Sequence, residues 1–273
     1  MVEGRVEIEV KDGIADVRLV RSDKMNALDN RMFDAIEEAG VQLAANPDVR
    51  VVVLSGEGRA FCAGLDMGSF AAMADSAPKE GADASASVDT ALNDRTHGLA
   101  NRAQHAAWVW HELPVPVIAA VHGVSFGGGF QVALGADIRY AAPGTRMSVM
   151  EIKWGLVPDM AGMPLMRNLA RDDVIRELTY TGRIFEAEEA QTLGFVTQVV
   201  EDPRAHAMEI AATIASKSPD AIRADKRLLN ASNNMPVAEL LQMESDEQNA
   251  LIGSPNQIEA VMSEMEKRPA NFS

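Results

Sequence analysis

Three consecutive glycines near the middle of the chain constrain the fold more than any other feature. The apolar, β-branched segment Val115–Val121 is typical of a buried strand, and it leads into Gly127-Gly128-Gly129. The run Phe130–Leu134 follows directly and is compatible with a helix. Each glycine inside a regular element costs roughly 0.5–1 kcal/mol relative to alanine, so three together indicate a close approach by a ligand or another backbone. A helix that begins on glycines presents bare N–H groups and the positive end of its dipole, which suits developing negative charge.

Strands and helices alternate on both sides of this segment. Apolar and polar residues alternate in Val6–Val10 and Ile14–Val20, and the pair Asp12-Gly13 between them is typical of a tight hairpin. Asp29 can cap a helix over residues 30–45, which ends at Asn46-Pro47. The same patterns predict a strand, a helix and a further strand, over residues 50–54, 102–112 and 136–141. This order is that of an α/β fold.

The pattern becomes almost wholly helical after residue 200. Helix-length segments punctuated by Pro, Gly or Asn follow one another, over residues 203–216, 220–230, 236–252 and 255–267. The sequence therefore predicts an α/β core over residues 1–200 and a helical region over 201–273. Residues 71–100 are rich in Ala, Ser and Asp, and we expect a mobile loop or lid there that shapes one end of the site.

Composition excludes several classes of function. The 273 residues carry a net charge of −15, which argues against nonspecific binding to nucleic acid or to an anionic membrane surface. No apolar run reaches the ~18 residues of a membrane span. The single cysteine, Cys62, fits a reduced, cytoplasmic location and is expected to be a buried small apolar residue. The five histidines show no metal-ligand spacing, so no metal site is expected.

Two glycine turns follow predicted parallel strands. Ala63-Gly64-Leu65 comes after the strand 50–54, and the three glycines come after Val115–Val121. Ligands of parallel sheets bind outside the carboxyl ends of the strands, so both turns can direct an N–H at one carbonyl oxygen. Such a two-donor oxyanion hole contributes roughly 10²–10³ in rate for each donor. The alternative is two turns with no shared target.

Two acids near residue 155 are candidates for proton transfer. Glu151 lies between Met150 and Ile152, and a carboxyl in apolar surroundings has a raised pKa and exchanges protons near neutrality. Asp159 follows Pro158 in a loop bounded by Gly and Pro. The alternatives are a structurally paired Glu151 and an Asp159 that caps the next helix.

A third motif predicts a different chemistry. Residues 123–127 read Gly-Val-Ser-Phe-Gly and fit the nucleophile elbow of serine hydrolases, with Ser125 as the nucleophile. His206 is the only histidine downstream that could serve as its base. We keep a serine hydrolase as a distant alternative.

Together these residues resemble the crotonase family, the enoyl-CoA hydratases and isomerases, over nearly the whole chain. The matching segments, in order, are 24–28, 59–66, 121–137, 151–159, 181–183, 194–196 and 266–269. The resemblance implies a crotonase-like spiral of β-β-α turns and a helical C-terminal region that packs trimers, often paired into hexamers. It implies that the N–H groups of Leu65 and Gly128 hold the thioester oxygen of an acyl-CoA while an enolate develops.

The resemblance also implies a set of substrate-binding residues. Coenzyme A enters as part of the substrate, and no separate cofactor is expected. Lys24 and Ala27 match the segment that lines the adenine site. Lys267 matches the end segment that reaches a CoA phosphate, on its own or a neighbouring subunit. The remaining expected binding residues lie beside the oxyanion turns: Ala63, Asp66, Met67, Gly127 and Gln131.

One position departs from the hydratase pattern. Hydratases of this family use two glutamates, of which Glu151 matches the second, whereas Gln131 stands at the first. An amide cannot transfer a proton at neutral pH, although it can orient a water. Asp159 resembles the acid of dienoyl-CoA isomerases, which also keep an acid where Gln131 stands. The resemblance favours isomerisation of an unsaturated acyl-CoA; a hydratase and a noncatalytic CoA-binding protein are the alternatives.

Overall fold

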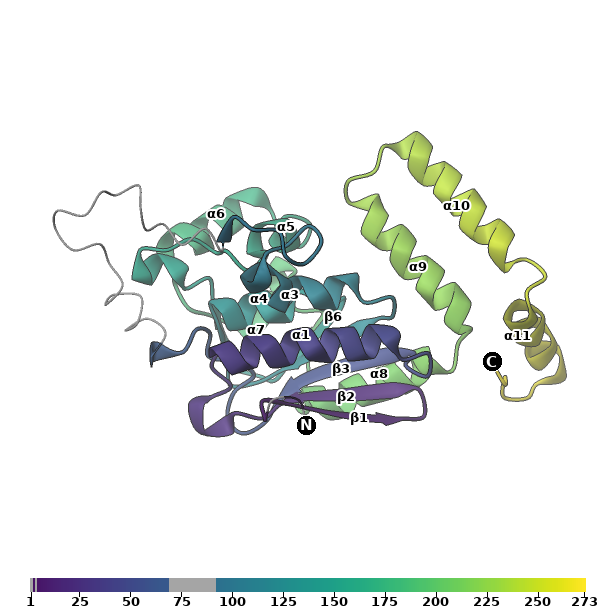
Figure 1. Ribbon diagram of the computed structural model, residues 1–273, viewed down its shortest axis with the longest axis horizontal. Helices are drawn as coiled ribbons and strands as arrows, with labels where there is room; N and C mark the ends of the chain where they lie inside the picture. The colour runs from purple at the N-terminus through teal and green to yellow at the C-terminus, as the bar shows by residue number, and fades with distance from the viewer. Residues whose placement is uncertain (1, 3, 69–91) are drawn as a thin grey trace.

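A computed structural model describes residues 2, 4–68 and 92–273, and shows two sheets with helices around them (Figure 1). The larger sheet has six strands in the order β1-β2-β3-β4-β6-β9. Their bounds are Val6–Lys11, Ile14–Leu19, Val51–Gly56, Val117–Val121, Ile138–Ala141 and Gln198–Val199. The smaller sheet, in the order β5-β7-β8, consists of Val124–Phe126, Arg146–Ser148 and Phe185–Glu186.

The hairpin at the start of the larger sheet confirms the sequence prediction. Lys11 pairs with Ile14, so Asp12 and Gly13 form a two-residue turn, and both have positive φ, 52° and 79°. Two positive φ angles in succession define the turn type that matches the twist of a hairpin. Every later pairing in this sheet is parallel, with Val53 of β3 opposite Ile118 of β4. The carboxyl ends of β3, β4 and β6 therefore meet at one edge.

The two faces of the larger sheet are covered by different helices. Val52 and Leu54 of β3 belong to the main core, which includes α1 (Asn30–Ala45) and α3 (Arg102–Glu112). Val51 and Val53, which point to the opposite face, pack with Ala207 and Ala211 of α8 (Pro203–Ala215). This alternation is the two-residue period of a strand covered on both sides. The expected boundary at residue 200 thus lies just before a helix that packs on the sheet.

Short elements surround the carboxyl edge of the larger sheet. They are α4, the 3₁₀ helix η3, α5, α6 and α7, over Gly128–Leu134, Glu151–Trp154, Gly162–Met166, Asp172–Thr181 and Ala187–Leu193. The glycine-led helix expected from the sequence is α4, and all its residues are buried. Most of the expected lid, residues 71–91, lies outside the described residues.

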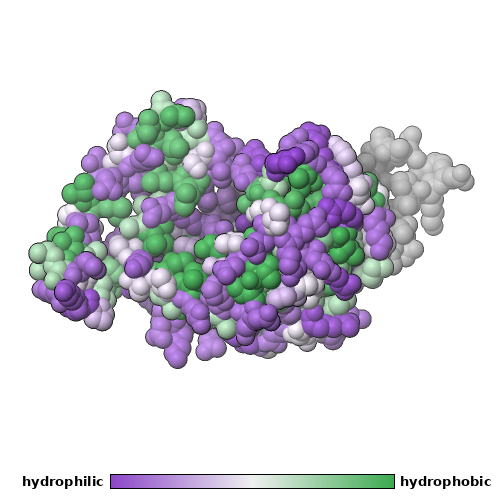
Figure 2. Space-filling view, turned by 180° about the vertical axis from the view of Figure 1, so that it is seen from behind, coloured by the Kyte–Doolittle hydropathy of each residue, from purple (hydrophilic) through white to green (hydrophobic). Residues whose placement is uncertain are grey.

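The last three helices form a C-terminal arm. They are α9 (Pro219–Ser232), α10 (Val237–Leu251) and α11 (Pro255–Glu266), and they extend to one side of the sheets (Figure 1). α10 has no buried residue, and apolar side chains gather on the outside of the arm (green, left of Figure 2). α9 is fixed to the body by Lys226, whose Nζ lies 2.8 Å from Asp137 Oδ2. In the described part of the chain, no helix is both long and apolar enough to cross a membrane.

Candidate active site

The two glycine turns expected to share a target lie against each other. A short parallel bridge joins the segments that carry them: the N–H of Cys62 donates to the carbonyl of Val124 at 3.2 Å, and the N–H of Phe126 donates back to the carbonyl of Cys62 at 3.1 Å. Two residues further on, a Cβ placed on Gly64 would lie 3.6 Å from the amide nitrogen of Gly128. The turns 63–65 and 126–128 are therefore neighbours.

The backbone amides in these turns are available for a ligand. Leu65 forms a parallel bridge with Leu28, whose N–H donates to Gly64 O at 2.8 Å and whose carbonyl accepts from Asp66 N–H at 3.0 Å. The N–H of the residue between those two points to the other side of the segment. The Leu65 amide has no hydrogen-bond partner among the described residues. Gly128 is the first residue of α4, where an amide has no partner within the helix.

Close backbone contact explains why glycine is needed in both turns. Gly64 has a φ of +88°, and its added Cβ would lie 2.5 Å from the carbonyl oxygen of Phe126. A Cβ on Gly129 would lie 2.3 Å from the carbonyl oxygen of Cys62. Any side chain at either position pushes the two turns apart, because the atom it meets belongs to the backbone.

Gln131 and Glu151 form a buried pair beside these turns. The Nε2 of Gln131 donates to Oε1 of Glu151 at 2.6 Å. The Oε1 of Gln131 accepts from the backbone N–H groups of Met160, at 2.9 Å, and Gly162, at 2.8 Å. Because backbone amides can only donate, they fix which end of the carboxamide is the oxygen. The two side chains are 1% and 9% exposed.

The oxygen of the Gln131 carboxamide is consequently committed to the protein. A carbonyl oxygen has two lone pairs, and the two backbone amides occupy both of them. Gln131 therefore has no acceptor left for a water, and only the second hydrogen of its NH₂ group remains to orient one. Its NH₂ group donates to one oxygen of Glu151 and leaves the other oxygen without this hydrogen bond.

That other oxygen, Glu151 Oε2, is buried and has no hydrogen-bond partner in the part of the chain that the structure describes. Burial raises the pKa of Glu151 above its ordinary value, and the charge of Asp159 raises it further, whereas the hydrogen bond from Gln131 lowers it. A carboxyl with a raised pKa and one free oxygen is suited to accept and return a proton near neutrality.

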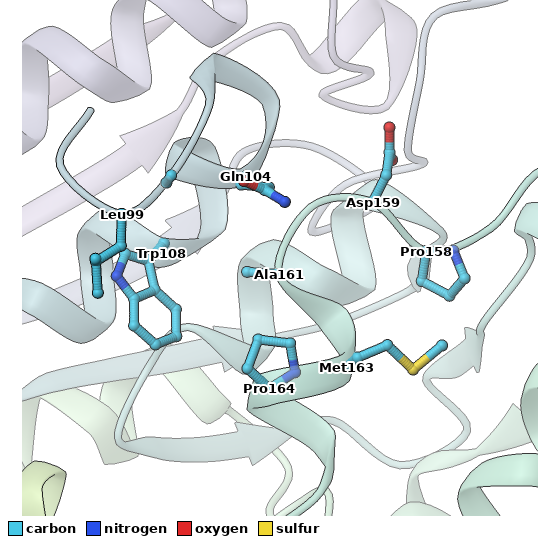
Figure 3. A pocket seen from close by; sticks show the side chains of 9 residues that line it. Leu99, Gln104, Trp108, Pro158, Asp159, Ala161, Met163 and Pro164 are labelled. Carbon is cyan, nitrogen blue, oxygen red and sulfur yellow. The ribbon is translucent and has the colours of Figure 1, made fainter. Parts of the chain in front are cut away.

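Asp159 lies in the wall of a cavity of about 330 Å³ (Figure 3). Its side chain is exposed to this space, yet the protein atoms around it displace enough water to raise the pKa of its carboxyl. The other lining residues come from the end of the 92–100 loop, from α3 and from the segment leading into α5: Leu99, Ala100, Gln104, Trp108, Pro158, Ala161, Met163 and Pro164.

Sequence reasoning missed the lining residues contributed by α3. Gln104 closes a capping box with Asn101, in which each side chain bonds the other residue's backbone N–H. The spacing Asn-x-x-Gln before an apolar run was a readable signal for that cap. Nothing in the sequence places α3 opposite residues 158–164, because that contact joins segments far apart in the chain.

The other expected substrate-binding residues occupy several environments. Ala63 donates its N–H to Met25 O at 2.9 Å, so it lies on the same surface as the segment that contains Lys24 and Ala27. Lys24 is exposed, and Ala27 is buried.

Two more of these residues lie beyond Leu65. The carboxylate of Asp66 forms an ion pair with Arg21 at 2.8 Å, and Met67 is largely exposed. Gly127 leaves room for the acid, since an added Cβ would lie 3.3 Å from Glu151 Oε1. Lys267 ends α11 on the arm, apart from α4 within this single chain (Figure 1).

The serine hydrolase geometry is absent from the described residues. The hydroxyl of Ser125 is fully buried and donates to Gly129 O at 3.2 Å. The ring of His206 packs edge-on against Tyr140 instead of approaching Ser125. Cys62 is buried as expected, and burial raises the pKa of its thiol to about 12. Among the residues described, no cluster of His, Cys, Asp and Glu could hold a metal ion.

Comparison with known sequences matches the chain to one family. The profile described as "Enoyl-CoA hydratase/isomerase" covers residues 9–273. A mitochondrial Δ(3,5)-Δ(2,4)-dienoyl-CoA isomerase from Mus musculus is 30% identical over 259 residues, which are 93% of this chain and 77% of the relative. A carnitinyl-CoA dehydratase from Salmonella enteritidis is 33% identical over 218 residues, 79% of this chain and 77% of the relative.

Comparison of structures agrees with the sequence match. The crystal structure of an enoyl-CoA hydratase from Bacillus anthracis superposes with a TM-score of 0.85 and 27% identity, covering 98% of both chains. The predicted mixed α/β crotonase fold with a helical C-terminal region is therefore confirmed. The chain belongs to the enoyl-CoA hydratase/isomerase family of acyl-CoA enzymes.

Proposed function

We propose that this enzyme isomerises an unsaturated acyl-CoA by moving one proton between two carbons of the acyl group. The observation that carries the proposal is the commitment of Gln131, which leaves Glu151 Oε2 as the free oxygen of the pair. Glu151 removes a proton from one carbon and returns it to another from the same oxygen. Such a shuttle needs a single carboxyl group, whereas hydration in this family uses two acids.

The two backbone amides stabilise the intermediate in this proposal. When the proton leaves, negative charge moves onto the thioester oxygen as an enolate. The N–H groups of Leu65 and Gly128 receive that oxygen, each contributing roughly 10²–10³ in rate. Their lack of partners among the described residues and the adjacency of their turns support this role.

A hydratase or dehydratase is the second candidate, and Asp159 is the observation that favours it. Its charge acts on Glu151, and it faces the cavity, so it can serve as the second acid or orient a water there. The relatives divide in the same way, because their names include dienoyl-CoA isomerases and a carnitinyl-CoA dehydratase.

Product analysis in heavy water separates the two candidates. The purified protein is incubated with 2-enoyl-, 3-enoyl- and dienoyl-CoA thioesters, and the products are weighed by mass spectrometry. Isomerisation exchanges hydrogens without adding mass for a water, whereas hydration adds one. Turnover that survives Glu151→Gln would remove Glu151 from its assigned role. Tight binding of every thioester with no turnover would indicate a noncatalytic CoA-binding protein.

Assembly completes the CoA site in this proposal. The exposed apolar residues of the arm are suited to pack against further copies of the chain in a trimer or hexamer. Lys24 and Ala27 line the adenine, and Lys267 reaches a CoA phosphate from its own or a neighbouring subunit. The proposed site needs no metal, nucleic acid or membrane, and the cytoplasmic location stays a prediction.

A further inference from the structure

The cavity beside Asp159 combines an apolar wall with two polar groups that face it. Seven of its nine lining residues are hydrocarbon, thioether or indole side chains, and only Gln104 and Asp159 are not. At about 330 Å³ it lies at the lower end of the volumes of ligand pockets, roughly 300–1,000 Å³. Gln104 therefore places a polar group in an otherwise apolar part of the wall.

The orientation of the Gln104 carboxamide follows from its hydrogen bond. Its Oε1 accepts the backbone N–H of Asn101 at 3.0 Å, and this amide can only donate. The NH₂ group is therefore the end turned toward the cavity. Figure 3 shows this nitrogen pointing toward the loop that carries Asp159. It has no hydrogen-bond partner among the described residues, whereas the oxygen end is held in place by the cap.

The opposite wall supplies the complementary group. The carboxyl of Asp159 is an acceptor when ionised and also a donor when protonated. It lines the same cavity, so a ligand that fills this space lies against the side chains of both Gln104 and Asp159. An anionic ligand group would be repelled by an ionised Asp159, which leaves a neutral oxygen as the matching chemistry.

From these contacts we infer that the enzyme acts on acyl groups that carry a neutral oxygen, a hydroxyl or carbonyl, beyond the reacting carbons. The oxygen accepts from Gln104 Nε2, and a hydroxyl also donates to Asp159. Leu99, Trp108 and Met163 enclose the hydrocarbon around it. Gln104 is then a specificity-determining residue, and a plain alkyl chain leaves its donor unpaired. This inference rests on the proposed acyl-CoA function and names its substrate class.

Binding of saturated thioesters tests the inference without requiring turnover. Hexanoyl-CoA and its 4-, 5- and 6-hydroxy derivatives are titrated into the wild-type protein by isothermal calorimetry. They share the CoA portion, so differences in Kd report on the acyl cavity. One hydroxyl position is expected to bind roughly 3- to 10-fold tighter than hexanoyl-CoA, the range of one net hydrogen bond.

Two variants that differ in how they affect the Asn101 cap identify the hydrogen-bond donor. Gln104→Glu keeps an oxygen for the Asn101 cap and removes the NH₂ group, whereas Gln104→Met keeps the length of the side chain and removes both polar atoms. The ratio of the Kd of hexanoyl-CoA to the Kd of the oxygenated ligand is expected to fall to about one or below in both variants, because the donor of Gln104 is gone. In Gln104→Glu this ratio is measured with the corresponding ketone, oxohexanoyl-CoA, because a hydroxyl can donate to the new carboxylate whereas a ketone cannot. Because the result is a ratio of two Kd values, any effect of the substitution that is common to both ligands cancels.

Each possible result supports or overturns the inference. Hexanoyl-CoA binding as tightly as every hydroxylated derivative, or a preference that persists in either variant, overturns the inference. A preference lost in both variants supports it, even if no unsaturated thioester is turned over, in which case only the proposed isomerase activity fails. Failure of every acyl-CoA to bind overturns both together.

Discussion

Glu151 has one free oxygen, and its protonation links activity to stability. Its pKa is raised above the ordinary 4.5, chiefly by burial. A carboxyl with a raised pKa in the folded state contributes stability below the unfolded value, and this contribution is lost as pH rises through the folded pKa. Glu151→Gln is therefore expected to raise the melting temperature at neutral pH while it lowers kcat/KM by roughly 10²–10⁴-fold.

The pH dependence of the wild-type enzyme provides a second check on Glu151. As the base of the free enzyme, Glu151 must be ionised, so kcat/KM is expected to fall as pH drops through a pKa above 4.5. Thermal melts of both proteins between pH 4 and 8 should converge at the acid end. A variant that is less stable than the wild type at neutral pH, or a flat pH profile, would contradict this assignment.

Gln131 can be tested with two substitutions that differ in one property. Gln131→Glu keeps an oxygen for the amides of Met160 and Gly162, whereas Gln131→Met leaves both buried donors unpaired. At roughly 1–3 kcal/mol for each unpaired group, Gln131→Met is expected to lower the free energy of unfolding by about 2–6 kcal/mol, measured in urea.

Gln131→Glu is expected to change the pH dependence of the reaction more than it changes the free energy of unfolding. Its second oxygen faces Glu151, so the two carboxyl groups share a proton and titrate as a coupled pair. The kcat/KM profile should shift to higher pH relative to the wild type. An unchanged profile would show that Gln131 does not act on Glu151.

The sequence predicted which residues belong to the candidate site better than it predicted the contacts that these residues make. Glu151 and Gln131 were singled out by their positions, but the Met160 and Gly162 amides that commit Gln131 were not. Those bonds depend on the path of the backbone around α5, where Ala161 has a positive φ of 63°. An alanine in this conformation gives no signal in a sequence.

The turn at Gly64 depends on close contact with a neighbouring turn, and a substitution there can be compared with one at a glycine that has no such contact. Gly64 and Gly144 both have positive φ, but only an alanine at Gly64 meets another atom, the Phe126 carbonyl, at 2.5 Å. Gly144→Ala measures backbone strain alone, roughly 1–2 kcal/mol. Gly64→Ala adds the displacement of a neighbouring turn and is expected to cost at least about 2 kcal/mol more.

Activity provides the control for this pair. Gly64→Ala is expected to lower kcat even at temperatures where the variant is folded, because the Leu65 and Gly128 amides no longer converge. Gly144→Ala should keep the wild-type kcat. Equal activity of the two variants would mean that the spacing of the turns does not matter for the reaction.

Elements with strong periodicity or clear caps were predicted well. The helices over residues 30–45 and 102–112 match α1 and α3 at both ends. The smaller sheet was not predicted, because its strands have only two or three residues each, too few to show an alternation. Their pairing is fixed by contacts between segments about 20 to 40 residues apart.

The whole molecule is expected to work as an oligomer through its arm. Val237 and Leu241 of α10 are 72% and 56% exposed, an unfavourable arrangement for a chain that functions alone. Mass photometry is expected to give a trimer or hexamer. Changing both residues to aspartate should lower the oligomeric state without loss of helical content, because neither side chain is buried within one chain.

Val41→Asp serves as the control for this prediction. Val41 is 63% exposed on α1, outside the arm, so its substitution should leave the assembly intact. A monomeric wild type, or dissociation by Val41→Asp alone, would contradict the assignment of the arm. The sequence predicted a helical region from residue 201. It did not predict that the first helix, α8, packs on the sheet while the last three form the arm, because such packing depends on contacts between distant segments.

Because Cys62 is fully buried, its reaction with a thiol reagent reports local opening of the wild-type protein. It is the only cysteine in 273 residues, and its thiol has no exposure and a pKa of about 12. Maleimide should modify the native enzyme only when the segment that holds Cys62 separates from β5, with which it forms a bridge. The labelling rate therefore measures how often the two glycine turns come apart. A fluorophore on a cysteine introduced at the surface would then remain a single-site label.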